Sequence, residues 1–225
     1  MIISTVNNKG GVGKTTTAAN LGAALRLRGY NVLLSDWDRQ ANLTESLRAY
    51  GPALEVVRVQ PKQNRAGVLD FLGVGMATPQ KIWATLAPIR GKYDFIVIDT
   101  PPALGKYTTA ALSVSDVAII TVQPHYLAAR GLKSIATFIK LIPGDFPKKT
   151  AVLFTQYDGR KVLHQATAEQ IRATFPAFAT IIRDNVALSE APASGLDIFR
   201  YAPRSHGAED YGNLCNELLK MIQNE

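Results

Sequence analysis

Short apolar runs alternate with longer stretches of helical periodicity along almost the whole chain. The apolar runs that predict strands are residues 2–6, 31–35, 95–98, 117–122, 151–155 and 180–183. The stretches that predict helices are residues 14–28, 41–50, 126–142, 161–175 and 208–223. The runs at 95–98 and 117–122 do not alternate with polar residues, which is typical of strands covered on both faces. The pattern therefore predicts an α/β fold with a mostly parallel central sheet and helices on both faces.

The domain organisation follows from length and composition. The 225 residues are 47% hydrophobic and 19% charged, which is a globular composition, and they contain no internal repeat or linker-like stretch. Residues 52–92 are the least regular part and contain four prolines, which we interpret as excursions between strands. We expect a single domain over residues 1–225.

Cysteine content and apolar runs restrict the class of protein. The one cysteine, Cys215, excludes an internal disulfide and any site built from paired thiolates within the chain. The first residues lack the basic and apolar segments of a signal peptide, and no run of about 18 apolar residues is present. We therefore expect a cytoplasmic protein that does not span a membrane.

The charge of the chain indicates which kind of partner it binds. The net charge is +7 and the pI is about 9.5. The basic excess is spread over residues 1–206, whereas residues 207–225 are acidic. Such a balance favours a polyanionic partner, although it also fits a basic, soluble surface.

The strongest motif lies between the first predicted strand and the first predicted helix. This is the context that a Walker A phosphate-binding loop requires, although Asn8 stands in place of the usual first glycine. Glycines let successive backbone N–H groups turn toward a phosphate, and a helix N-terminus adds positive potential. Lys14 supplies charge for the β- and γ-phosphates, and the Thr15 hydroxyl can ligate Mg²⁺. The expected nucleotide-binding residues are Lys9, Gly10, Gly11, Val12, Gly13, Lys14, Thr15 and Thr16.

The lysine at position 9, followed by two glycines, makes this a deviant Walker A motif. On this motif the chain resembles the ParA/MinD family of ATPases. The resemblance implies ATP and Mg²⁺ as cofactors and an ATP-dependent homodimer. In that dimer Lys9 reaches the nucleotide of the partner subunit, so that Lys9 and Lys14 both serve catalysis.

Two further segments resemble the switch regions of this family. Residues 35–42 contain Asp36 and Asp38 at the end of a predicted strand, and residues 95–102 place Asp99 at the end of another. The carboxyl ends of strands are where open α/β sheets bind ligands. The resemblance implies that Asp38 positions or activates the attacking water. It also implies that Asp36 supports the metal shell and that Asp99 holds Mg²⁺ through water.

The C-terminal half resembles the partition ParA proteins of plasmids and chromosomes. The segments that carry this similarity are residues 154–160 and 182–192. It implies that the loop containing Pro192 helps to enclose the adenine. It also implies slow hydrolysis that a ParB-like or analogous adaptor stimulates, since the chain contains no obvious arginine finger.

Partition proteins of this type bind DNA non-specifically in their ATP state, through phosphate contacts rather than base contacts. No helix-turn-helix segment precedes the first strand, so we expect nucleoid association without operator recognition. His125 and Arg130 stand where relatives tend to be acidic, which puts the family's partner contacts in question. The candidates for DNA contacts are Arg160, Lys161, Arg183, Arg200 and Arg204.

Two other classes of protein stay open at this point. A MinD-like positioning ATPase would end in a basic amphipathic helix that binds lipid. Residues 214–225 instead have a net charge of −1, and their apolar positions are expected to pack on the sheet. Reductases with a similar loop need more cysteines than Cys215, and amide-forming ligases need a substrate pocket that the sequence does not identify.

Overall fold

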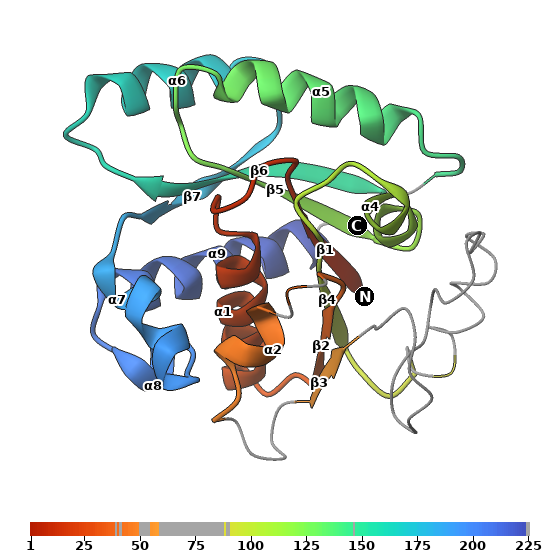
Figure 1. Ribbon diagram of the computed structural model, residues 1–225, viewed down its shortest axis with the longest axis vertical. Helices are drawn as coiled ribbons and strands as arrows, with labels where there is room; N and C mark the ends of the chain where they lie inside the picture. Colours follow the sequence, from red (N-terminus) through yellow and green to blue (C-terminus); the bar gives the residue numbers. More distant parts are fainter. Residues whose placement is uncertain are drawn as a thin grey trace.

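The computed structural model is a parallel sheet between two layers of helices (Figure 1). It describes residues 1–38, 40, 42–49, 55–58, 88, 91–145 and 147–223. Most of the irregular segment at 52–92 therefore lies outside the described residues, as do Arg39 and Ala41 of the first switch region.

The sheet has seven strands over the described residues, in the order β3-β2-β4-β1-β5-β6-β7, and every neighbouring pair is parallel. The strands are β1 Ile2–Val6, β2 Val32–Asp36, β3 Glu55–Arg58, β4 Phe95–Asp99, β5 Val117–Val122, β6 Lys149–Tyr157 and β7 Ala177–Arg183. The register pairs Asp99 with Thr5 on one side and with Asp36 on the other. The polar residues at the carboxyl ends of β1, β2 and β4 therefore lie side by side.

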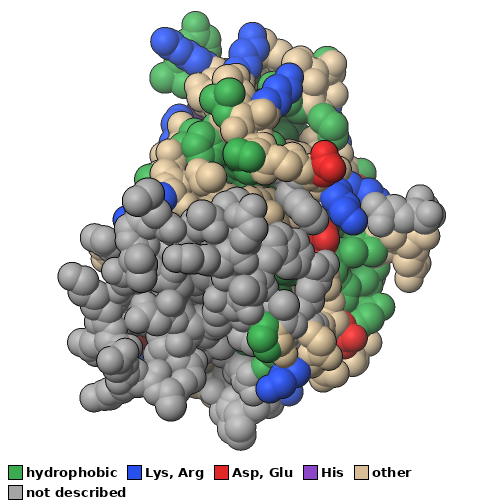
Figure 2. All heavy atoms as spheres, turned by 90° about the vertical axis from the view of Figure 1, so that its right-hand side faces the viewer, with side chains coloured by type: hydrophobic (Ala, Val, Ile, Leu, Met, Phe, Trp, Pro, Cys, Tyr) green, Lys and Arg blue, Asp and Glu red, His purple; other side chains and the backbone are tan. Residues whose placement is uncertain are grey.

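Helices cover both faces, as the alternating pattern predicts. They are α1 Lys14–Leu27, α2 Asn42–Ser46, α4 Lys106–Leu112, α5 Ala128–Lys140, α6 Val162–Arg172, α7 Val186–Glu190, the 3-10 turn η1 Ala191–Ser194, α8 Ile198–Tyr201 and α9 His206–Gln223. Helices α1 and α9 bury their apolar residues against one face, and α4, α5 and α6 cover the other (Figure 1). Figure 2 shows the side that lies on the right of Figure 1; in its upper part lysine and arginine side chains lie among hydrophobic ones.

The core explains why the strands are continuously apolar. Neighbouring residues such as Ile2 and Ile3 point into opposite helical layers, and both are fully buried. Gly22 lets α1 lie directly on β2, since a methyl group there would overlap the side chain of Leu34. Leu214 and Leu218 of α9 are fully buried in the same layer, as expected for a C-terminal helix that packs on the sheet. No helix in the described part of the chain is long and apolar enough to cross a membrane.

Element boundaries differ from the sequence-based expectations where capping and edge effects intervene. Helix α5 begins at Ala128 rather than residue 126, because a turn follows Pro124. Strand β7 begins at Ala177 rather than residue 180; as the last strand of the sheet it is only partly buried, which weakens its apolar signal. The short helices α4, α7 and α8 have too few residues to show a helical period and were not predicted.

Candidate nucleotide-binding site

The phosphate loop connects β1 to α1 and is shaped by two left-handed glycines. Gly11 has φ of 72° and Gly13 has φ of 81°, values that strain any residue with a side chain. The Thr17 amide donates to the Gly13 carbonyl at 2.8 Å, which closes the first turn of α1. The loop therefore presents backbone N–H groups at a helix N-terminus, where an anion is stabilised.

The two lysines of the motif lie in different environments. Lys14 is buried, and its Nζ donates to the Lys9 carbonyl at 2.8 Å. Burial lowers the pKa of Lys14, and the nearby carboxylates of Asp99 and Asp38 oppose that shift. Lys9 is exposed, with its backbone N–H held by Asn7 Oδ1 at 2.9 Å. The loop thus keeps one lysine inside and presents the other to solvent.

Asp99 and Thr15 meet at the position expected for the metal. The Thr15 hydroxyl donates to Asp99 Oδ2 at 2.6 Å, and the Thr5 hydroxyl lies 3.3 Å from Asp99 Oδ1. Asp99 is fully buried, and burial raises the pKa of its carboxyl to about 7. Within the described residues the hydrogen bonds to the Asp99 carboxylate come from the hydroxyls of Thr5 and Thr15. Burying a carboxylate with such partners is costly, and a cation at this point would offset that cost. Carboxylate and hydroxyl oxygens are the donors that Mg²⁺ prefers, so these residues fit the ion.

The two carboxylates after β2 have separate surroundings. Asp36 is fully buried; its Oδ1 accepts the Asp38 amide at 3.1 Å, and its Oδ2 accepts both the amide and the hydroxyl of Thr44. Burial raises the pKa of Asp36, although these hydrogen bonds oppose the shift. Asp36 therefore joins the end of β2 to α2, and its place in the metal shell stays a prediction. Asp38 is half-buried, accepts only the Gln40 amide in the described part of the chain, and lies close enough to Lys14 to act on its pKa.

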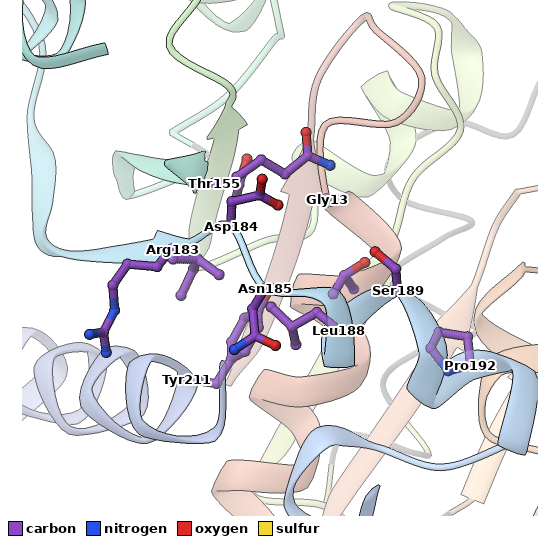
Figure 3. A pocket seen from close by; sticks show the side chains of 12 residues that line it. Gly13, Thr155, Arg183, Asp184, Asn185, Leu188, Ser189, Pro192 and Tyr211 are labelled. Atoms are coloured by element: carbon purple, nitrogen blue, oxygen red, sulfur yellow. The ribbon is translucent and has the colours of Figure 1, made fainter. Parts of the chain in front are cut away.

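A cavity of about 280 Å³ opens beside the phosphate loop (Figure 3). Its wall combines Gly13 and Thr16 with the end of β6, the segment after β7, and Tyr211 of α9. Pro192, which the family resemblance places near the adenine, also lines it. The volume is close to the lower end of small-ligand pockets, and its position next to the loop suits a nucleoside.

Sequence reasoning missed several residues that build this site. Thr155 and Gln156 at the end of β6 donate to the carbonyls of Val12 and Gly11. Both residues belong to the segment 154–160 that carries the resemblance to partition proteins, but the sequence predicted no contact between them and the phosphate loop. Tyr211 lies within a predicted helix, and its hydroxyl lies 3.2 Å from that of Thr17. These contacts join segments that are far apart in the sequence.

Four of the five candidates for DNA contacts fall into two groups. Arg160 and Lys161 precede α6 and lie 3.0 Å and 3.8 Å from the carboxylate of Asp158. Arg200 and Arg204 are exposed on and after α8, in the opposite helical layer. His125 and Arg130 are exposed near the start of α5.

The fifth candidate, Arg183, lies at the end of β7. Its guanidinium turns away from the cavity toward α9, where it bonds both oxygens of Asp210 and also Glu209 (Figure 3). These hydrogen bonds raise the pKa of Arg183, and two carboxylates offset its charge. This pairing joins the end of β7 to α9, and the role of Arg183 in DNA binding stays a prediction.

The family model of the CobQ/CobB/MinD/ParA nucleotide binding domain matches residues 3–198. The chain belongs to this family. It is 37% identical to the chromosome-partitioning ATPase Soj of Thermus thermophilus, covering 98% of this chain and 96% of that protein. It is 36% identical to the sporulation initiation inhibitor protein Soj of Bacillus subtilis, covering 96% and 97%.

Solved structures agree with this membership. Cobyrinic acid a,c-diamide synthase from Mycobacterium smegmatis, with bound ADP and magnesium, is 27% identical with a TM-score of 0.74, covering 99% of this chain and 95% of that one. The septum site-determining protein MinD from Pyrococcus horikoshii, complexed with Mg-ADP, is 25% identical with a TM-score of 0.75, covering 98% and 96%. The expected family, the P-loop α/β fold and the assignment as an ATPase with ATP and Mg²⁺ as cofactors are confirmed.

Proposed function

We propose that this protein is a partition ATPase that dimerises on binding ATP and segregates or positions a DNA or other cargo. The observation that carries the proposal is the separation of the two lysines of the loop. Lys14 is buried and bonded within its own loop, whereas Lys9 is exposed where a second subunit can approach. The near full-length similarity to chromosome-partitioning ATPases supports the same cellular role.

In this proposal the residues of the site divide the work of hydrolysis. Gly10–Thr16 bind the phosphates through backbone N–H groups, and the buried Lys14 neutralises their charge. Thr15 and Asp99 would hold Mg²⁺, with Asp36 supporting that shell; the ion, when bound, stabilises charge on the β- and γ-phosphates. Asp38 orients the attacking water and accepts its proton, and Pro192 borders the base.

Basal turnover is slow in this proposal because the chain supplies no obvious arginine finger of its own. Phosphoryl transfer depends mainly on positioning and charge neutralisation, so a partner that completes the site increases the rate. A ParB-like or analogous adaptor fills this role. The ATP dimer binds nucleoid DNA non-specifically, which the net charge of +7 supports.

The test uses Asp38→Ala, which is expected to bind ATP and remain trapped as a dimer. We expect this variant to co-sediment with non-specific duplex DNA in ATP but not in ADP, and to lose the DNA as salt is raised. Anionic liposomes serve as the second ligand, and Asp145→Ala, an exposed carboxylate outside the site, is the control variant. Unchanged turnover in Asp38→Ala would show that another carboxylate serves the water.

The liposome arm separates this proposal from the MinD-like alternative. Binding to liposomes without binding to DNA would assign the protein to the membrane-associated class. The burial of Leu214 and Leu218 in the core argues against that outcome, because a lipid-binding helix must expose its apolar face. Binding to neither ligand would contradict both readings and point to a protein-only or small-molecule partner.

Removal of two exposed arginines should lower DNA affinity without changing nucleotide affinity. We expect Arg200→Ala/Arg204→Ala to make the plot of log K against log salt shallower by about 2, since each phosphate contact contributes about 0.9. Fluorescence anisotropy with labelled duplex in ATP measures this slope. Lys140→Ala, on α5 in the other helical layer, is the control. An unchanged slope in the double variant would exclude α8 from the DNA interface.

A further inference from the structure

Gln156 has an unusual backbone conformation at the end of β6. Its φ is 50°, and it is the one non-glycine residue with positive φ over the part of the chain that the structure describes. Residues other than glycine, asparagine and aspartate rarely adopt this conformation, because their Cβ is crowded there. Such a conformation persists where the surroundings enforce it, and it is concentrated at functional sites.

The side chain of Gln156 reaches the phosphate loop. Its Nε2 donates to the Gly11 carbonyl at 2.9 Å, and the hydroxyl of the preceding Thr155 donates to the Val12 carbonyl at 3.0 Å. Two consecutive side chains of β6 thus hold two consecutive carbonyls of the loop. Gln156 also lines the nucleoside cavity, so one residue borders both parts of the site.

A hydrogen bond to each of these carbonyls also fixes the backbone N–H group in the same peptide unit. The peptide unit is planar and trans, so a fixed Gly11 carbonyl also fixes the direction of the Val12 N–H. On the other side of Gly11, the Lys9 carbonyl is held by Lys14 Nζ. Hydrogen bonds therefore hold the segment from Lys9 to Val12 at both ends. Lys14 Nζ bonds the Lys9 carbonyl, and Thr155 of β6 bonds the Val12 carbonyl. Donors that are fixed in advance stabilise developing charge without a cost of reorganisation.

We propose that Gln156 is a positioning residue for ATP turnover. It acts through its hydrogen bond to Gly11, which holds the backbone segment from Lys9 to Val12 in place. The inference rests on the ATPase function proposed above. Among the residues proposed to bind the phosphates, the Gln156 amide bonds Gly11, whereas Gly13–Thr16 lie beyond that contact. Its loss therefore affects the rate of hydrolysis and the ATP-dependent dimer more than it affects the binding of ADP.

Two variants distinguish the effect of the Gln156 side-chain amide from the effect of the backbone conformation at this residue. Gln156→Met keeps the length of the side chain and removes the donor. Gln156→Asn keeps the donor but is one methylene shorter, and asparagine tolerates positive φ better than glutamine. Gln170→Met, at an exposed position on α6, controls for the substitution itself. For each protein we would measure kcat and KM for ATP, the Kd for ADP, ATP-dependent dimerisation and Tm.

We expect kcat to fall about tenfold in both Gln156 variants, with the Kd for ADP within twofold of wild type and a weaker ATP dimer. The Tm of Gln156→Asn should equal or exceed that of wild type, because the strain at φ of 50° is relieved. Wild-type kcat in Gln156→Met, which lacks the donor, would overturn the inference and leave a backbone role only. A parallel loss of kcat, ADP affinity and Tm would assign Gln156 to fold stability alone. Absence of ATPase activity in the wild-type protein would instead contradict the proposed function itself.

Discussion

Lys9→Ala is expected to abolish the ATP-dependent dimer while the monomer binds ATP with nearly unchanged affinity. Lys9 is exposed, and only its backbone carbonyl contacts Lys14, so alanine leaves the phosphate-binding interior intact. In the proposed dimer the interaction lost is a charge-assisted contact to the phosphates of the other subunit. Truncating such a contact costs about 2–5 kcal/mol, or at least thirtyfold in the dimer dissociation constant. Sedimentation velocity with a slowly hydrolysed ATP analogue measures the loss, and equilibrium dialysis measures nucleotide affinity.

The control for this experiment is Lys133→Ala, which removes another exposed lysine, on α5. It should dimerise as the wild type does. A normal ATP-dependent dimer in Lys9→Ala would refute the arrangement in which nucleotide is shared between subunits. Loss of ATP binding in the monomer would show that Lys9 serves the nucleotide of its own subunit.

Asp99→Asn is expected to stabilise the nucleotide-free protein at alkaline pH and to lower Mg²⁺-dependent hydrolysis by at least a hundredfold. In the folded chain the pKa of Asp99 is about 7, against 3.8 for the ordinary carboxyl. The unfolded chain therefore releases this proton at lower pH than the folded chain does. Stability falls as pH rises from about 4 to about 7, and the full cost, on the order of a few kcal/mol, persists above pH 7. Asparagine carries no charge and removes this cost.

Urea unfolding at pH 5 and pH 8 without nucleotide tests the stability half of this prediction. The gain in Asp99→Asn should be larger at pH 8, and Asp145→Asn, an exposed carboxylate, should show no such difference. An Asp99→Asn protein that is less stable than wild type at pH 8 would mean that the Asp99 carboxylate is already compensated by its neighbours. If Asp99→Asn retained Mg²⁺-dependent hydrolysis, Asp99 would not be a ligand of the metal.

Part of the site could be predicted because its chemistry lies in one local segment. The loop from Lys9 to Thr16 follows a strand and opens a helix, and this short succession suffices to define a phosphate site. The carboxylates were also visible, since Asp36 and Asp99 each end an apolar run. Their separate surroundings were not visible, because the hydrogen bonds of Asp36 to Thr44 depend on how α2 folds back over β2.

By itself the sequence determined the α/β class, the two helical layers and the phosphate loop, because each follows from hydrophobic periodicity or from a motif within a few residues. Only the tertiary structure decided which distant groups meet. Thr15 contacts Asp99 across 84 positions because β1 and β4 are neighbours, and Gln156 contacts Gly11 across 145 positions because β6 ends beside the loop. It also paired Arg183 at the end of β7 with Asp210 of α9. Strand order and register set such contacts, and an apolar run specifies that a strand is buried without specifying its neighbours.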